Sequence, residues 1–188
     1  MTRGRRRGQR GQALVETAVV VGVILTLLMG VYSVSQYASD QNTAGTATRA
    51  GARLAAELGN GGYTPGNKTG CQATPQDPCA LDRQIVQVVC QIAATMPFVT
   101  SITAVDVYRA TGSGGSGDLT DSFTITPCAP NQAPAAAAYT LDNRVQTHPN
   151  EAYIGVSMTY KYKSPVPLLP LAATSTVYTV LQLSPHFA

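Results

Sequence analysis

Charged side chains are scarce in this sequence. Asp, Glu, Lys and Arg make up 12% of its 188 residues, whereas a typical soluble domain has about 25%. Five of the 13 basic residues lie among the first ten residues, MTRGRRRGQR, which contain no acid. Residues 12–188 therefore carry 8 basic and 10 acidic side chains, a formal charge of −2. This body lacks the basic surface that nucleic-acid binding requires, so nucleic acid is not an expected partner.

Signatures of catalysis and of metal binding are missing as well. Only two histidines occur, His148 and His186, and neither has a carboxylate or a cysteine at ligand spacing. The GSGGSG run at 112–117 lacks the following helix that a phosphate-binding loop requires, so it indicates a flexible connector. The length allows one domain with an appendage. We therefore expect no enzyme, no metal site, no cofactor and no small-molecule substrate.

What the sequence does contain is one long apolar run near its start. From Thr17 to Val34 there are 18 residues without a charge, enough to cross the roughly 30 Å hydrocarbon core as a helix. The arginines on the N-terminal flank favour a cytoplasmic N-terminus. We therefore expect a single-pass membrane protein whose residues after about 36 lie outside the cytoplasm.

A cleaved secretory signal is the alternative interpretation. The arginine-rich start and the small residues Ser33 and Ser35 fit it loosely. Against it, the apolar run is longer than the usual 7–15 residues of a signal, and Glu16 lies where the apolar stretch should begin.

The position of Glu16 is informative because a carboxylate at the edge of a membrane helix is costly unless it is paired or reaches the interface. Gly11 is followed by Gln12, and Glu16 is the fifth residue counted from Gln12. A glycine, four residues and a glutamate, opening an apolar helix behind a basic leader, resemble the start of type IV prepilins. The resemblance implies cleavage between Gly11 and Gln12 and a charge-pairing role for Glu16 in assembly. Alternatively, Glu16 only extends to the headgroups beside Arg10.

The wider N-terminal region resembles the TadE-like family, the pseudopilins of the tight-adherence (Flp) pilus system. The resemblance rests on RGQALVE at residues 10–16, on the apolar run and on AGARLAA at residues 50–56. It covers roughly the first third of the chain, and the last strand pair is also similar. Thr17 stands where many processed members have an aromatic residue, a departure that concerns cleavage more than membership.

This resemblance implies a minor pseudopilin that serves as a structural or assembly component of a Tad/Flp-type pilus. Its partners would be the membrane, other pilins or pseudopilins, the pilus assembly platform and prepilin peptidase. The subunit could also be incorporated in a surface pilus. The alternative is an anchored or secreted binding module, such as an adhesin outside any pilus, and an envelope enzyme ranks third.

Residue patterns predict three segments: a basic cytoplasmic leader at 1–11, a transmembrane and stalk helix at 12–58, and an extracytoplasmic head at 59–188. Glycines 59, 61 and 62 would end the long helix, and a break near Asn42–Gly45 is plausible. In the head, helical spacing begins at Leu81 and ends at Pro97. Strands are expected at 102–109, 122–126, 154–162 and 177–183. The expected fold is α+β and pilin-like, with one helix packed on an antiparallel sheet of about four strands.

Small residues recur along the membrane segment at steps of four. Ala18, Gly22, Thr26 and Gly30 would share one stripe of the helix, where backbones of neighbouring helices can approach closely. The plainer alternative is that glycines are common in membrane helices.

The four cysteines contain no C-x-x-C pair, so zinc is a poor match. Outside the cytoplasm, two disulfides explain them better. Three pairings are possible. We prefer Cys71–Cys79, which closes a proline-rich loop, together with Cys90–Cys128, which ties the head helix to a strand end.

Overall fold

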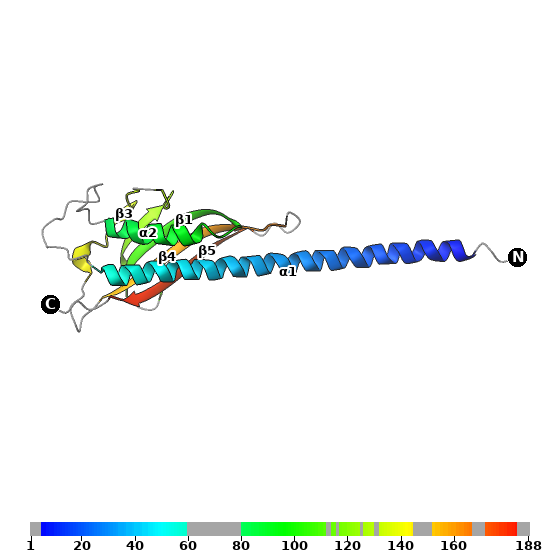
Figure 1. Ribbon diagram of the computed structural model, residues 1–188, viewed down its shortest axis with the longest axis horizontal. Helices are drawn as coiled ribbons and strands as arrows, with labels where there is room; N and C mark the ends of the chain where they lie inside the picture. The colour runs from blue at the N-terminus through cyan, green and yellow to red at the C-terminus, as the bar shows by residue number, and fades with distance from the viewer. Residues whose placement is uncertain are drawn as a thin grey trace.

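A computed structural model describes residues 5–59, 80–111, 114–115, 117–124, 126–129, 132–144, 152–166 and 172–183. A single helix projects far beyond a small head (Figure 1). In chain order the elements are α1 (Arg5–Leu58), α2 (Ala80–Ala93), β1 (Val99–Ala110), β2 (Gly117–Thr124), β3 (Ala136–Ala137), a 3-10 turn (Leu141–Asn143), β4 (Tyr153–Lys163) and β5 (Ala172–Gln182).

Helix α1 is continuous over 54 residues, which at 1.5 Å per residue is about 80 Å. The predicted break near Asn42–Gly45 is wrong. Thr43 and Thr46 direct their hydroxyls to carbonyls one turn back, at 3.1 and 3.0 Å, and Ala44 is fully buried against the head. Packing therefore outweighs the weak helix propensity of this stretch. The helix ends at Gly59, whose φ of 52° is a left-handed conformation that glycine adopts freely.

The head has two layers, with α1 and α2 on one face of a single sheet (Figure 1). The strand order is β3-β2-β1-β4-β5, and all neighbouring strands are antiparallel. The α+β prediction is confirmed, with five strands where about four were expected. The additional strand, β3, has only two residues and no alternating pattern, so the sequence offered no strand signal there.

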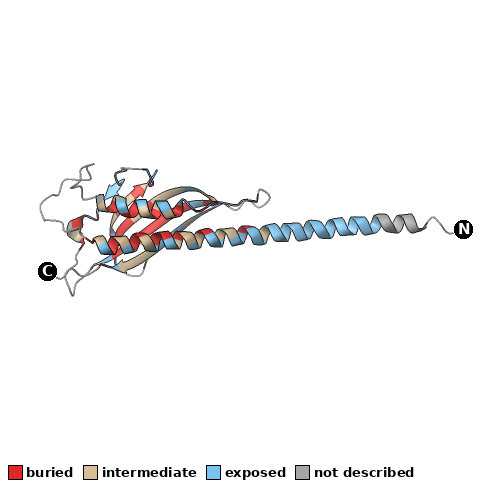
Figure 2. Ribbon diagram, viewed as in Figure 1, coloured by how far each residue is buried: buried red, intermediate tan, exposed pale blue. Residues whose placement is uncertain are grey.

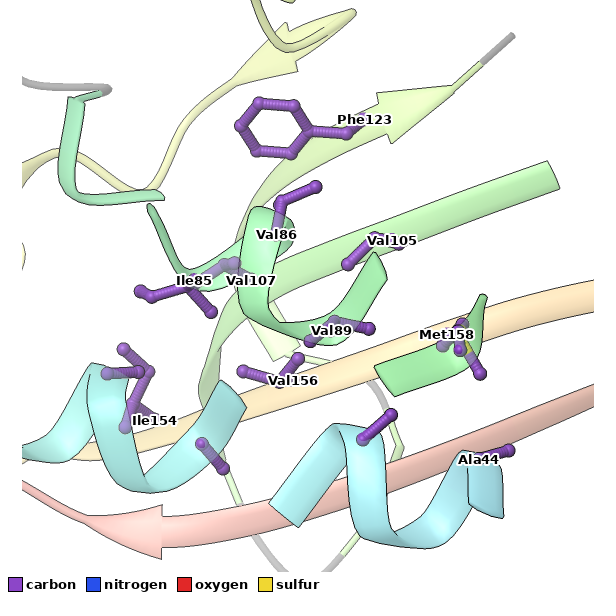
Figure 3. Packing of buried hydrophobic residues seen from close by; sticks show 14 of the residues in the cluster. Ala44, Ile85, Val86, Val89, Val105, Val107, Phe123, Ile154, Val156 and Met158 are labelled. Atoms are coloured by element: carbon purple, nitrogen blue, oxygen red, sulfur yellow. The ribbon is translucent and has the colours of Figure 1, made fainter. Parts of the chain in front are cut away.

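The core lies between the two layers (Figure 3). Val105 and Val107 of β1 pair with Met158 and Val156 of β4, and all four side chains are fully buried. From the other layer, α2 contributes buried side chains at helical spacing: Ile85, Val86, Val89 and Ala93. The helix predicted from the spacing of apolar residues beginning at Leu81 is thus confirmed as a helix that faces the core.

The second half of α1 buries small side chains. Ala44, Ala47, Ala52 and Ala55 have no exposed surface, and they follow one another at steps of three to five residues. Gly51 marks the closest approach to α2, because a Cβ atom there would lie 2.5 Å from the Val89 Cγ2 atom. The long helix is therefore part of the head's core as well as its stalk (Figure 2).

No helix of the described residues covers the opposite face of the sheet, and the side chains there are mainly polar. Ser122 and Ser157 both donate to the Asp106 carboxylate, at 2.5 and 3.2 Å. Tyr108 lies over Gly155, where a Cβ atom would approach its ring carbon Cζ to 2.2 Å. Burial, aided by Tyr178 and Asp106, raises the pKa of Tyr108 to about 12.

The glycine run between β1 and β2 also packs on this face. Gly114 accepts a hydrogen bond from the Tyr108 hydroxyl at 3.3 Å. A Cβ atom on Gly115 would lie 2.6 Å from the Tyr178 ring. Gly115 therefore allows the chain to approach Tyr178 closely, which the sequence did not indicate, whereas a Cβ atom on Gly114 would meet nothing within 4 Å.

Candidate functional site

The first half of α1 forms a long apolar surface, most of which is exposed. Its large apolar side chains from Leu14 to Val34 are between 40% and 72% exposed, and Figure 2 shows this half extending away from the head. Among the described residues it is the one helix long and apolar enough to cross a membrane. Apolar surface of this extent is typical of contact with lipid or with other apolar helices.

The threonine and serine side chains of this segment form hydrogen bonds within the helix. Thr17 donates to the Ala13 carbonyl at 2.8 Å, Thr26 to the Val23 carbonyl at 2.8 Å, and Ser33 to the Met29 carbonyl at 3.0 Å. A hydroxyl that is satisfied in this way avoids most of the cost of entering hydrocarbon. These residues are therefore compatible with a membrane helix.

The residues of the predicted cleavage and pairing site lie in the first turns of α1. Gly11 and Gln12 are both helical, and Gln12 and Glu16 are exposed and one turn apart. Residues four apart are neighbours on a helix surface. Among the described residues, Glu16 has no ion-pair or hydrogen-bond partner. Cleavage at Gly11–Gln12 and the pairing role of Glu16 stay predictions.

The small-residue stripe is free of contact with the head along most of its length. Ala18, Gly22 and Thr26 are exposed, and Gly30, nearest the head, is partly covered. A Cβ atom on Gly22 would meet no other atom within 4 Å. The stripe is thus available to another helix, although its role in packing stays a prediction.

Where the head meets the apolar segment, hydrogen bonds join β4 to α1. The Tyr162 hydroxyl donates to the Ser33 carbonyl at 3.2 Å, and the Ser164 and Ser33 hydroxyls lie 3.3 Å apart. The Tyr162 ring also packs edge-on against Tyr37, with centroids 5.1 Å apart. Gln41 donates to the hydroxyls of Tyr37 and Ser175, at 2.7 and 2.9 Å. These contacts fix the end of β4 at the level of the last turns of the apolar segment.

Asp40 lies about two helical turns beyond Ser33 on α1 and is buried. Burial raises the pKa of this carboxyl, and a backbone hydrogen bond from Phe98 opposes the shift in part. Its Oδ2 atom has no hydrogen-bond partner within the part of the chain that the structure describes. No pattern in the sequence indicated that this acid would be enclosed, because the residues that cover it are distant in the chain.

A second buried polar cluster connects α2, β2 and the segment after the 3-10 turn. Arg144 donates to Asp82 at 2.5 Å and lies over the Tyr139 ring, with its guanidinium carbon 4.8 Å from the centroid. Asp121 accepts from the backbone N–H of Tyr139 at 2.7 Å. Burial and the neighbouring Asp82 raise the pKa of Asp121 to about 8. At neutral pH one protonated carboxyl therefore accompanies one arginine–carboxylate pair.

The sequence analysis did not predict this cluster, because its members are far apart along the chain. Its members are at most 3% exposed, so a substrate has no access to it through the described residues. Within those same residues, no group of three or more His, Cys, Asp or Glu side chains is arranged to hold a metal ion. His148 and His186 lie outside the described residues. We therefore interpret the cluster as a structural connection.

The predicted Cys90–Cys128 disulfide is confirmed. It joins α2 to the segment after β2, with Cα atoms 5.6 Å apart. Cys71 and Cys79 lie outside the described residues, so their pairing stays a prediction.

Comparison with known protein families matches residues 11–53 to the family described as TadE-like protein. No curated protein and no solved structure matches the chain. The match begins at the predicted cleavage site, includes the whole apolar segment and ends in the part of α1 that packs on the head. The TadE-like resemblance noted in the sequence is therefore confirmed over residues 11–53.

Proposed function

We propose that this protein is a minor pseudopilin, a structural or assembly component of a Tad/Flp-type pilus. The TadE-like match supports a component of that pilus system. The observation that carries the finer proposal is the division of α1, because one continuous helix is apolar and exposed in its first half and packs into a small head in its second. A subunit of this shape can pack its helix among other pilin helices and present its head outside them.

In this proposal, prepilin peptidase cuts between Gly11 and Gln12 and removes all five leader arginines. The new α-amine on Gln12 is cationic at neutral pH, since such groups have a pKa of about 7.7–8.0. Glu16 lies one turn further along the helix. The amine of an adjacent subunit would offset the cost of that carboxylate in an apolar surrounding. Such pairing would favour one axial register between neighbouring subunits.

The role is structural and requires no catalysis. Support comes from the main group of polar side chains that converge in the head. Asp82, Asp121 and Arg144 are buried and interact with one another. A substrate would have to open the core to reach them.

Shearing and fractionation of cells test the proposal. The full chain should co-purify with sheared pili or with their assembly proteins, and it should lose this association when the pilus assembly platform is deleted. A protein that is displayed at the surface equally well without that platform would instead be a stand-alone binding module, and the pseudopilin proposal would be wrong.

A further inference from the structure

Two of the three lysines in the sequence lie together at the end of β4 nearest the apolar helix. Lys161 and Lys163 are both exposed. They are two residues apart in one strand, so their side chains leave the same face of the sheet. That face is the one opposite α1 and α2, because the intervening Tyr162 is buried toward α1.

The hydrogen bonds at the base of the head set the height of these lysines along α1. Lys163 lies between Tyr162 and Ser164, and both of those residues contact Ser33. Ser33 in turn lies in the last turn of the apolar run Thr17–Val34. If that run occupies the roughly 30 Å hydrocarbon core, its end coincides with the start of the headgroup layer. The two lysines therefore lie at headgroup level.

No described acid is a cross-strand neighbour of this pair, and Asp106 on the same face lies opposite Ser157, four residues from Lys161. The cross-strand neighbours of Lys161 are Ser101 and Thr174, and that of Lys163 is Ala172. Between Glu16 and Arg49, α1 has a single acid, Asp40, and it is buried on the other side of the sheet. The positive charge is therefore neutralised by no described side chain.

We propose that Lys161 and Lys163 bind the phosphate groups of anionic phospholipids in the leaflet on the head's side of the membrane. The contact would hold the base of the head against the bilayer while the subunit is membrane-anchored. Electrostatic attraction of a lysine to an anionic surface corresponds to roughly a fivefold enrichment of the lipid per lysine. The inference depends on the membrane placement of α1 in the proposed function.

The test uses the full chain in nanodiscs of phosphatidylcholine with one fifth phosphatidylglycerol. A photoreactive benzoylphenylalanine replaces Thr174, which is exposed and pairs with Lys161, and mass spectrometry counts the lipid adducts. We expect phosphatidylglycerol adducts to exceed its share of the bilayer several-fold. Lys161→Gln with Lys163→Gln should bring the ratio close to that share. The matched control, Arg49→Gln with Arg53→Gln, removes two exposed charges further along α1 and should leave the enrichment unchanged.

The outcomes separate the possible failures. Absence of lipid adducts, absence of enrichment, or enrichment that survives the lysine substitutions would overturn the inference while leaving the pseudopilin proposal intact. Loss of enrichment on adding glycerol 3-phosphate would assign the lysines to a soluble phosphate and would overturn it too. Failure of the chain to enter nanodiscs, or its release from membranes by alkali, would instead contradict the membrane placement and with it the proposed function.

Discussion

At the scale of single residues, Gly51 sets how closely α1 and α2 pack. An added methyl group would meet the Val89 Cγ2 atom at 2.5 Å, and a valine in a packed helix has little freedom to rotate. We expect Gly51→Ala to destabilise the head by about 1–3 kcal/mol, despite the gain in helix propensity. Urea unfolding of the full chain in detergent, followed by circular dichroism, measures this.

Gly45 provides the matched control for this prediction. It lies in the same helix, and a Cβ atom there would meet nothing within 4 Å. Gly45→Ala should therefore stabilise the helix by up to about 1 kcal/mol. Equal unfolding midpoints for the two variants would show that the helices do not approach as described.

Asp121 makes the stability of the head depend on pH. Its pKa is raised to about 8 in the folded protein, whereas an unfolded aspartate titrates near 3.9. Between these values the folded state retains a proton that the unfolded state releases, so stability falls as the pH rises from about 4 to about 8. Asp121→Asn keeps a neutral acceptor for the Tyr139 N–H and should remove this loss.

Unfolding midpoints at pH 5, 6.5 and 8 test this prediction. In the unmodified chain we expect the free energy of unfolding to fall by about 1 kcal/mol per pH unit. Asp118→Asn in the same strand is the control. The pKa of Asp118 is lowered by its hydrogen bond with Arg109. The Asp118→Asn variant should therefore still lose stability as the pH rises from 5 to 8. The same pH dependence in Asp121→Asn and the unmodified chain would contradict the assignment.

At the scale of elements, the membrane half of α1 should associate through its stripe of small residues. Gly22→Leu with Gly30→Leu should weaken crosslinking or co-purification with partner helices roughly tenfold, because bulky side chains keep backbones apart. Insertion should be unaffected, since leucine is apolar. The control, Val21→Leu with Met29→Leu, lies about 100° away around the helix. If the stripe variant associates normally, the stripe is not an interface.

The disulfides define a second prediction at this scale. Cys90–Cys128 closes a loop with a sequence separation of 38, which by chain entropy contributes about 3–4 kcal/mol. Replacing this pair with serine should therefore destabilise the head more than replacing Cys71 and Cys79, whose loop is shorter. Non-reducing peptide mapping should find both bridges. Free thiols or bound zinc at Cys71 and Cys79 would contradict the predicted pairing.

Most elements were predictable because each has its own periodicity. Tyr160 and Tyr162 alternate with Lys161 and Lys163, so β4 could be identified from residues 154–162, close to its bounds of Tyr153–Lys163. The prediction of a break near Gly45 was wrong because the packing of Ala44 and Gly51 depends on residues that are distant in the chain. The cluster of Asp82, Asp121 and Arg144 was invisible for the same reason, since its members come from three separate elements.

At the scale of the whole molecule, maturation should convert the chain from a membrane protein with a charged leader into a subunit able to assemble. We expect Gly11→Leu to block cleavage, leaving the leader in the mass of the recovered N-terminus. Glu16→Ala should allow cleavage but reduce incorporation into pili at least tenfold, because the amine of Gln12 loses its partner.

Glu16→Gln separates the two interpretations of this residue. If Glu16 only extends to the headgroups, the uncharged variant should assemble normally, whereas charge pairing requires it to fail. Recovery of Met1 or Thr2 as the N-terminus of protein from an assembled pilus would contradict cleavage and leave the membrane anchor untouched.

Because α1 is unbroken, the head is rigidly attached to the apolar half of the helix. No hinge separates the apolar half from the half that is built into the core, so the head turns with its shaft. Each residue of an α-helix advances 1.5 Å and turns about 100°. If a fixed contact on a neighbouring helix held the next residue of α1 instead, the helix would have to move by about 1.5 Å and turn by about 100°, and the head would turn with it. A contact that selects one residue of α1 therefore fixes both the depth of the helix and the direction in which its head points.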